Sequence, residues 1–247
     1  MAPIGKYNLL ELRHIDEDKQ LRVAYEARYM SEPIQHLDSF YRWVLRVVAP
    51  QPDRRLLDVA CGQGILPNLA AAYGVRAYGC DLSAYALKSK HNPQVSLIVA
   101  DGEHLPYADG VFDYITNIGS LEHYINPCNG VREMARLLKP GGRAFILLPN
   151  TFGFGNFLYA WRHGRTLDDG QPIQRYAARY EWQALLEDNG LCVVNTLAYE
   201  RVWPTSLKDV IWYLSNPKAL VLLFISLLLP FNLASCFMYI CERRKLG

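Results

Sequence analysis

The stretch from Arg55 to Leu66, RLLDVACGQGIL, constrains the fold of this 247-residue chain more than any other. Leu56, Leu57 and Val59 form a short apolar run, typical of a strand that is buried on both faces of a parallel sheet. The glycines of Cys-Gly-Gln-Gly then allow a tight turn and the close approach of a ligand. An alanine-rich helix is predicted from Ile65 to Tyr73, and its first N–H groups can face an anion. The stretch therefore predicts a nucleotide-type binding loop.

Further apolar runs follow this stretch, and helical patterns lie between them. Strands are predicted at Val75–Cys80, Val95–Ala100, Val111–Asn117, Arg143–Leu148 and Leu191–Tyr199. Helices are predicted at 34–49, at Ser83–Lys90 with Ser83 as its cap, near Gly130–Leu138 and at Glu181–Asp188. Strands and helices that alternate in this rhythm are typical of a Rossmann-like, doubly wound α/β fold.

Polar residues stand at the carboxyl ends of the first four predicted strands, where open α/β sheets bind their ligands. These residues are Asp58, Asp81, Asp101 and Asn117. The carboxylate of Asp81 can accept hydrogen bonds from both ribose hydroxyls of a nucleoside, and that of Asp101 can accept one from the exocyclic amine of adenine. A single aspartate at a strand end is more often a helix cap or loop anchor. Four polar residues at one sheet edge favour a nucleoside site.

Four motifs between Leu56 and Leu148 carry a family resemblance: LLDVACGQG, AYGCDLSAYAL, LIVADGEHLPYADGVFDYI and EMARLLKPGGRAFILLP. Together they resemble the type 11 family of class I S-adenosylmethionine-dependent methyltransferases, where alanine often replaces the first loop glycine, as Ala60 does here. The resemblance implies S-adenosylmethionine as the cofactor and a seven-stranded sheet in three α/β/α layers, with Leu191–Tyr199 as the sixth strand and an antiparallel last strand. It also implies a structural acid at Asp113 and a turn at Lys139-Pro-Gly-Gly.

The resemblance implies a set of cofactor-binding residues on these motifs. They are Asp58, Ala60, Gly62, Gln63, Gly64, Asp81, Leu82, Asp101, Gly102, Glu103 and Asn117.

His123, in the segment SLEHYINP, is the candidate catalytic residue. Methyl transfer from a sulfonium is an in-line displacement, so alignment of the acceptor can supply much of the acceleration. An amine or hydroxyl acceptor must also lose a proton, which a nearby histidine can accept. The alternative interpretation is a histidine that hydrogen-bonds the backbone and fixes its loop, since the family often carries a histidine here without using it as a base.

A long insertion at 149–180 is expected to form a lid over the methyl-donor end of the cofactor, as the resemblance implies. Phe154, Trp161 and Tyr176 in this lid, together with Tyr25 and Tyr29, are candidate substrate-binding residues, because aromatic side chains with a few polar groups suit a small-molecule pocket. A lid that packs on the sheet without touching substrate is the alternative. The expected acceptor is a small molecule, lipid-linked, quinone-like or sugar-containing, that takes the methyl group on O, N or C.

The C-terminal segment from Pro217 to Cys241 is long and apolar enough to be a membrane anchor, which needs about 20 residues. Pro230 and Asn232 interrupt it, however, and the following residues are rich in aromatic and β-branched types. We therefore predict the seventh strand at 234–242 and an inserted helix at 206–229. The apolar face of that helix either covers the acceptor pocket or contacts a membrane surface. The domains expected are an N-terminal helical cap at 1–50 and a methyltransferase domain at 51–247.

Composition excludes some classes of protein. A net charge of +2 argues against nucleic-acid binding. The six cysteines lack a CxxC pair or a histidine at metal-ligand spacing, so no metal is expected. The first twenty residues lack the apolar core of a signal peptide, so a cytoplasmic location is expected. Peripheral contact with a membrane is left open. Two alternatives stay open: a non-catalytic cofactor-binding protein of this fold, and a nicotinamide-dependent oxidoreductase, against which Pro67 stands at the third glycine position.

Overall fold

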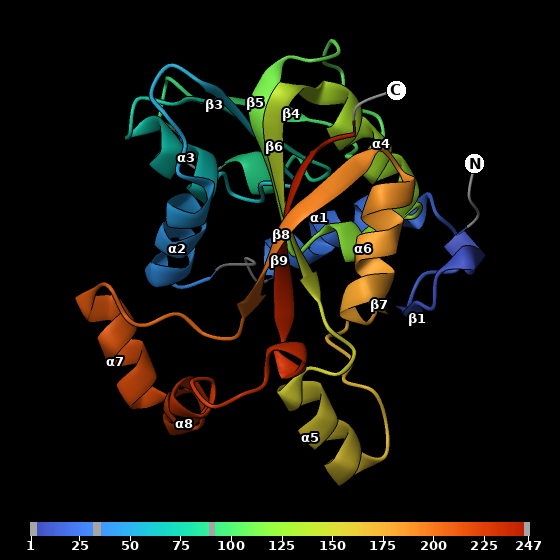
Figure 1. The fold of residues 1–247 in the computed structure, drawn as a ribbon, viewed down its shortest axis with the longest axis vertical. Helices are drawn as coiled ribbons and strands as arrows, with labels where there is room; N and C mark the ends of the chain where they lie inside the picture. Colours follow the sequence, from blue (N-terminus) through green and yellow to red (C-terminus); the bar gives the residue numbers. More distant parts are fainter. Residues whose placement is uncertain (1–3, 32–35, 89–91, 245–247) are drawn as a thin grey trace.

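A computed structural model describes residues 4–31, 36–88 and 92–244 and has a seven-stranded sheet at its centre (Figure 1). The strands are β2 (Arg55–Val59), β3 (Arg76–Asp81), β4 (Ser96–Val99), β5 (Phe112–Ile118), β6 (Leu138–Pro149), β8 (Leu191–Tyr199) and β9 (Cys236–Arg243). Their order across the sheet is β4-β3-β2-β5-β6-β9-β8. Neighbours from β4 to β6 are parallel, and β9 is antiparallel to both β6 and β8. The predicted fold class is confirmed.

Strand β6 begins five residues earlier than the sequence predicts, and the expected turn at Lys139-Pro-Gly-Gly is instead an irregularity inside this strand. Leu138 pairs with Phe112 and Arg143 pairs with Tyr114, so the residues between them bulge opposite Asp113. The carboxylate of Asp113 accepts hydrogen bonds from the backbone N–H of Arg55 at 2.9 Å and from Lys139 Nζ at 2.8 Å. Asp113 therefore joins β5 to both of its neighbouring strands, β2 and β6, which is a structural role.

Helices cover both faces of the sheet, as a doubly wound fold requires. On one face lie α2 (Asp38–Val48) and α3 (Ile65–Ala71), and on the other lie α4 (Pro127–Leu137) and α6 (Arg179–Asp188). Helix α2 begins at Asp38, later than the predicted start at residue 34. Residues 34 and 35 of the predicted helix lie outside the described part. In place of the predicted helix from Ser83, a 3-10 turn, η2 (Ala86–Lys88), is present, and Ser83 Oγ accepts the N–H of Ala86 at 3.1 Å. Residues 89 and 90 lie outside the described part.

The N-terminal segment contains a strand that the sequence analysis did not predict. After a 3-10 turn, η1 (Ile4–Lys6), strand β1 (Leu10–Arg13) pairs antiparallel with β7 (Ile173–Tyr176) of the long insertion. Helix α1 (Gln20–Ser31) follows. The helical cap predicted at 1–50 therefore also contains a strand, because a four-residue strand with weak alternation is stabilised by a partner more than 150 residues away.

The apolar C-terminal segment ends in a strand at the centre of the sheet. Phe237, Met238, Tyr239 and Cys241 are fully buried on β9, which pairs on both sides. The strand predicted at 234–242 is confirmed, and the membrane-anchor reading of this segment is wrong. In the described part of the chain, every helix falls short of the length and apolarity needed to cross a bilayer.

The helix predicted at 206–229 is two helices, α7 (Leu207–Ser215) and α8 (Pro217–Ile225), followed by a 3-10 turn, η4 (Phe231–Leu233). The break falls at Asn216, because proline disfavours the helical conformation of the preceding residue and has no N–H to donate. A capping box at Ser206 and Asp209 starts α7. Figure 1 shows α7, α8 and α5 (Phe154–His163) projecting together from one end of the sheet.

Candidate active site

A cavity lies at the carboxyl ends of the parallel strands. Eleven residues that the sequence analysis selected line it: Tyr25, Tyr29, Asp58, Ala60, Gly62, Asp81, Leu82, Asp101, Gly102, Glu103 and His123. Residues that it did not select complete the wall, among them Leu21, His36, Tyr41, Val44, Cys61, Ser120, Tyr124 and Gln171. The topology therefore gathers three motif loops, helix α1 and the start of α2 around one space.

The loop after β2 has the backbone conformation expected of a glycine loop that a ligand approaches closely. Gly62 and Gly64 have positive φ angles of 53° and 73°, and Ala60 also has a positive φ, at 60°. A side chain at positive φ is strained by about 1–3 kcal/mol, and such strain is concentrated at functional sites. The hydroxyl of Tyr29 lies 3.0 Å from the position that a Cβ on Gly62 would take. Residue 62 therefore must be small for Tyr29 to reach the loop.

Asp81 holds this loop in place. One of its carboxylate oxygens accepts the N–H of Gly62 at 2.8 Å, and the other accepts the N–H of Ser83 at 2.9 Å. The side chain is buried, and burial raises its pKa. Each carboxylate oxygen has a second lone pair that can accept a hydroxyl hydrogen. Asp81 can therefore fix the loop and receive a ligand at the same time.

Asp58 lies beside Asp81 in the cavity wall and is also buried. Thr116 Oγ1 donates a hydrogen bond of 2.6 Å to Asp58 Oδ1. Burial raises the pKa of Asp58 to about 7, with a smaller contribution from the charge of Asp81. A cationic group in the cavity would stabilise the ionised form of this pair.

The turn after β4 forms a third wall. Asp101 Oδ1 accepts the N–H of Glu103 at 2.9 Å. The carboxylate of Glu103 accepts the N–H of Asn126 at 2.9 Å and Asn129 Nδ2 at 3.2 Å, so it anchors the start of α4. Gly102 allows the ring of Tyr124 to pack closely, because a Cβ there would lie 2.1 Å from the tyrosine hydroxyl.

Three of the residues implied for cofactor binding lie outside the cavity lining: Gln63, Gly64 and Asn117. Asn117 is fully buried under the loop. Its Nδ2 donates to the carbonyl of Val59 at 3.3 Å and to the hydroxyl of Tyr124 at 3.1 Å, while its Oδ1 accepts the N–H of Leu121 at 3.0 Å. Asn117 therefore supports the loop that follows β5 instead of facing the cavity.

His123 lies in a 3-10 turn, η3 (Leu121–His123), with one ring nitrogen fixed. Its Nδ1 lies 2.5 Å from the carbonyl oxygen of Ile173, which can only accept, so Nδ1 carries the hydrogen and Nε2 carries the lone pair. Burial lowers the pKa of His123 to about 4, so the ring is neutral at pH 7. Tyr25 packs edge-on at 6.4 Å between ring centroids. The lone pair of Nε2 is thus available for a proton, on a weakly basic ring.

Glu122 is the other titratable group in this turn. Its Oε1 lies 3.8 Å from His123 Nε2, and its buried Oε2 has no hydrogen-bond partner among the described residues. Burial raises the pKa of Glu122 to about 8. At neutral pH this carboxyl group is therefore mostly protonated and can donate a hydrogen bond.

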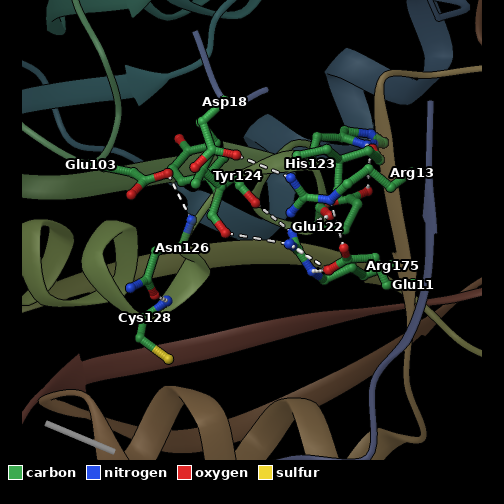
Figure 2. A network of polar contacts seen from close by, with 12 residues as sticks. Glu11, Arg13, Asp18, Glu103, Glu122, His123, Tyr124, Asn126, Cys128 and Arg175 are labelled. Carbon is green, nitrogen blue, oxygen red and sulfur yellow. Dashed lines mark hydrogen bonds and ion pairs between the residues drawn. The ribbon is translucent and has the colours of Figure 1, made fainter. Parts of the chain in front are cut away.

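Arg175 on β7 holds the backbone of this turn, as Figure 2 shows. Its guanidinium donates to the carbonyl oxygens of Glu122 at 3.2 Å, Ile125 at 3.3 Å and Tyr124, and it forms an ion pair of 2.7 Å with Glu11 on β1. The arginine side chain is 1% exposed. The small sheet of β1 and β7 thus positions the turn that carries His123, a contact for which the sequence offers no local signal.

Helix α1 closes the cavity from the N-terminal side. Glu26 accepts hydrogen bonds from Ser83 Oγ at 2.8 Å and from the N–H groups of Ala84 at 2.7 Å and Tyr85 at 3.0 Å, which caps the turn after β3. Tyr25 donates to Gln171 Oε1 of the insertion at 3.2 Å. This role of Glu26 is not predictable from the sequence, because no residue near Glu26 in the sequence indicates a partner 57 residues away.

The three candidate substrate residues of the insertion do not reach the cavity. Trp161 is 81% exposed on α5, Tyr176 is buried beside β1, and Phe154 starts α5 outside the cavity lining. The segment around Gln171, rather than α5, contacts the cavity.

Residues 57–146 match the family described as "Methyltransferase domain". The chain is 35% identical over 111 residues to a demethylmenaquinone methyltransferase of Corynebacterium kroppenstedtii, which covers 44% of this chain and 48% of that protein. It is 33% identical over 153 residues to a ubiquinone biosynthesis O-methyltransferase of Thiobacillus denitrificans, a match that covers 59% of this chain and 61% of that protein.

Residues 57–146 form a class I methyltransferase domain. S-Adenosylmethionine is the methyl donor of this class, and the resemblance found in the sequence motifs is confirmed. A solved Burkholderia thailandensis 1,6-didemethyltoxoflavin N1-methyltransferase has the same fold, with a TM-score of 0.61 at 14% identity over 96% of this chain and 95% of that one. The chain spans about half the length of the curated relatives that it matches.

Proposed function

We propose that this methyltransferase moves the methyl group of S-adenosylmethionine to an apolar, quinone-like small molecule. The observation that carries the proposal is that the motif loops and two tyrosines of α1 line one and the same cavity. Tyr25, Tyr29 and Leu21 from α1 line this space together with Asp81 and Asp101. One side suits a nucleoside, and the other suits a flat apolar acceptor.

The residues present fit the cofactor. Asp81 would hold the ribose hydroxyls, Asp101 would accept from the adenine amine, and the backbone at Gly62 would allow the close approach of the amino-acid portion. Without a ligand, the pKa of about 7 leaves Asp58 half-ionised at neutral pH. The positive charge of a nearby sulfonium would favour the ionised form of Asp58. The cofactor supplies an already activated methyl group when bound.

The work left to the chain is to align the acceptor and to exclude water. Tyr25 and His123 stand on the acceptor side, held by Gln171 and by the carbonyl of Ile173. A neutral His123 can accept a hydrogen bond from a phenolic hydroxyl at Nε2, which orients that oxygen. Because phenols are far more acidic than alcohols, a weak base suffices for their proton. This supports an aromatic hydroxyl or its ring carbon as the methylated position.

The names of two relatives support the same acceptor class. One is a demethylmenaquinone methyltransferase, and the other acts in ubiquinone biosynthesis. Both names denote quinone chemistry.

A two-part experiment tests the proposal. Calorimetry with S-adenosylmethionine and S-adenosylhomocysteine should show binding of both to the purified chain. Transfer of a labelled methyl group should then occur to hydroquinone or polyphenol acceptors and not to sugars. Cofactor binding without transfer to any acceptor in a broad panel would favour the non-catalytic alternative, and transfer to sugars alone would contradict the acceptor class.

A further inference from the structure

Helices α5, α7 and α8 and the turn η4 lie at one end of the molecule (Figure 1), and they carry many exposed apolar side chains. Most of the exposed large apolar side chains of the described chain lie in α5, in the turn before it, or between Trp203 and Leu233. We call this region the apolar surface, and its members include Trp161, Leu207, Ile211, Leu214, Phe224 and Leu228. Leu228 is 86% exposed and Trp161 is 81% exposed. Contiguous exposure of this kind marks an interaction site.

The two parts of the apolar surface are joined in space. Asn150, which precedes α5, donates through Nδ2 to the carbonyl oxygens of Asn232 at 2.9 Å and Ala234 at 2.8 Å. A Cβ on Gly153 would lie 2.9 Å from the Cα of Ser235. The start of α5 and the end of η4 therefore lie side by side, and their exposed residues belong to one region.

The helices of this region bury little of their own apolar area. Between α7 and α8 only Tyr213, Ala219 and Leu223 form a buried cluster, with Leu37 and Leu220 at its margin. Asp209 and Ser206 fix the start of α7, and Tyr213 donates to the carbonyl of Val202 at 2.9 Å. The apolar side chains are thus held facing outward by ordered helices.

The charges of this region indicate what covers it. Segments 152–166 and 201–233 contain the cations Arg162, Arg165, Arg201, Lys208 and Lys218, and none of them forms an ion pair with a described residue. Their one acidic residue, Asp209, is 1% exposed. The exposed Asp168 and Asp169 follow the first segment, and Asp168 pairs with His14 at 3.0 Å. Within the two segments, apolar side chains with flanking cations and no exposed acid complement an anionic lipid surface, whereas helices of nine residues are too short to cross a bilayer.

We infer that the apolar surface docks this protein onto an anionic phospholipid bilayer. A second hollow, lined by Trp212 and Tyr213 of α7, shares His36 with the cofactor cavity. The docked face therefore lies next to the cavity, so an apolar acceptor dissolved in the membrane has a short path to it. The inference does not rest on the proposed function, because binding to lipid requires no turnover.

Vesicle flotation with the purified full chain tests this inference. The chain should float with vesicles of equal parts phosphatidylcholine and phosphatidylglycerol, and about tenfold less with phosphatidylcholine alone. The double variant Leu207→Glu with Leu228→Glu should lower binding at least about tenfold. Lys208→Glu with Lys218→Glu should remove the preference for anionic vesicles.

The matched control is Val23→Glu with Tyr73→Glu, since these side chains are 69% and 61% exposed outside the apolar surface. This control should bind vesicles as the unaltered chain does. Calorimetry without vesicles should give all variants the same cofactor affinity, which separates loss of docking from loss of folding or of methyltransferase function.

Three results would overturn the inference. The first is failure of the unaltered chain to float with either vesicle, and the second is an equal loss of binding in the control. The third is light scattering that shows a dimer which Leu207→Glu with Leu228→Glu converts to monomer, because the surface would then be an interface between copies.

Discussion

Asp81 is the residue on which the proposed cofactor site depends most. Its carboxylate already accepts the N–H groups of Gly62 and Ser83, and ribose hydroxyls would add charge-assisted hydrogen bonds, each contributing about 1.5–3 kcal/mol. We expect Asp81→Ala to lower S-adenosylmethionine affinity at least about tenfold by calorimetry, because tenfold corresponds to about 1.4 kcal/mol. Asp53→Asn, which neutralises an exposed carboxylate, is the control and should bind normally. Unchanged affinity in Asp81→Ala would remove the assignment.

Glu122 makes the stability of the cofactor-free chain depend on pH. Its pKa is raised to about 8 in the folded state, so its contribution to stability is complete below the unfolded pKa, near 4, and is lost as pH rises toward 8. Asp58, raised to about 7, acts in the same direction. His123, lowered to about 4, acts in the opposite direction but only below about pH 6.5. Thermal melting should therefore show stability falling from pH 6.5 to 8.

The variant Glu122→Gln should weaken this dependence, because the amide cannot ionise. Glu187→Gln on α6 is the control, since its carboxylate lies outside the cavity. Equal slopes in the unaltered chain and in Glu122→Gln would show that Glu122 does not carry the effect.

At the scale of elements, the small β1–β7 sheet positions the turn that carries His123. Arg175→Met would leave three backbone carbonyls without their donor and would leave Glu11 paired with Arg13 alone, and breaking a buried pair costs about 3–5 kcal/mol. We expect the free energy of unfolding, measured by denaturant titration, to fall toward the lower end of this range, because Glu11 is partly exposed. Turnover should fall more than tenfold while cofactor affinity changes little, since Asp81 and the loop after β2 lie on other elements.

Arg13→Met tests whether this effect is specific. Arg13 pairs with the same Glu11 and with Asp18, but at the surface, where such pairs contribute about 0–1 kcal/mol. A loss of turnover as large in Arg13→Met as in Arg175→Met would contradict a positioning role for the buried arginine.

At the scale of the whole molecule, the last strand completes the sheet. Strand β9 pairs with β6 and β8 along its length, so deletion of residues 234–247 would leave two apolar edges and a gap through the core. We expect the truncated chain to lose its cooperative thermal transition by circular dichroism and its cofactor binding. The control is Val194→Ala on β8, whose side chain is 49% exposed, and it should preserve both. Normal cofactor binding by the chain lacking 234–247 would show that the sheet tolerates the loss of its centre.

The sequence by itself determined the cofactor half of the fold. Leu56, Leu57 and Val59 are buried on both faces, so their apolar run predicts a central parallel strand, and the glycines after them predict the loop. Asp58, Asp81 and Asp101 follow from the same logic, because parallel strands bring their carboxyl ends to one edge. Even β9 was predictable, since Pro230 and the residue types after it distinguish a strand from a membrane span.

Only the tertiary structure decided which residues surround the proposed acceptor side of the cavity. Glu26, Glu11 and Arg175 act on partners far away in sequence, and a single charged residue gives no local signal of its partner. The same limit applies to Trp161 and Tyr176: aromatic composition predicts burial or binding but not the direction of a side chain, and here Trp161 faces solvent and Tyr176 packs beside β1. Periodic patterns fix an element and its buried face, whereas long-range pairing fixes what each loop covers.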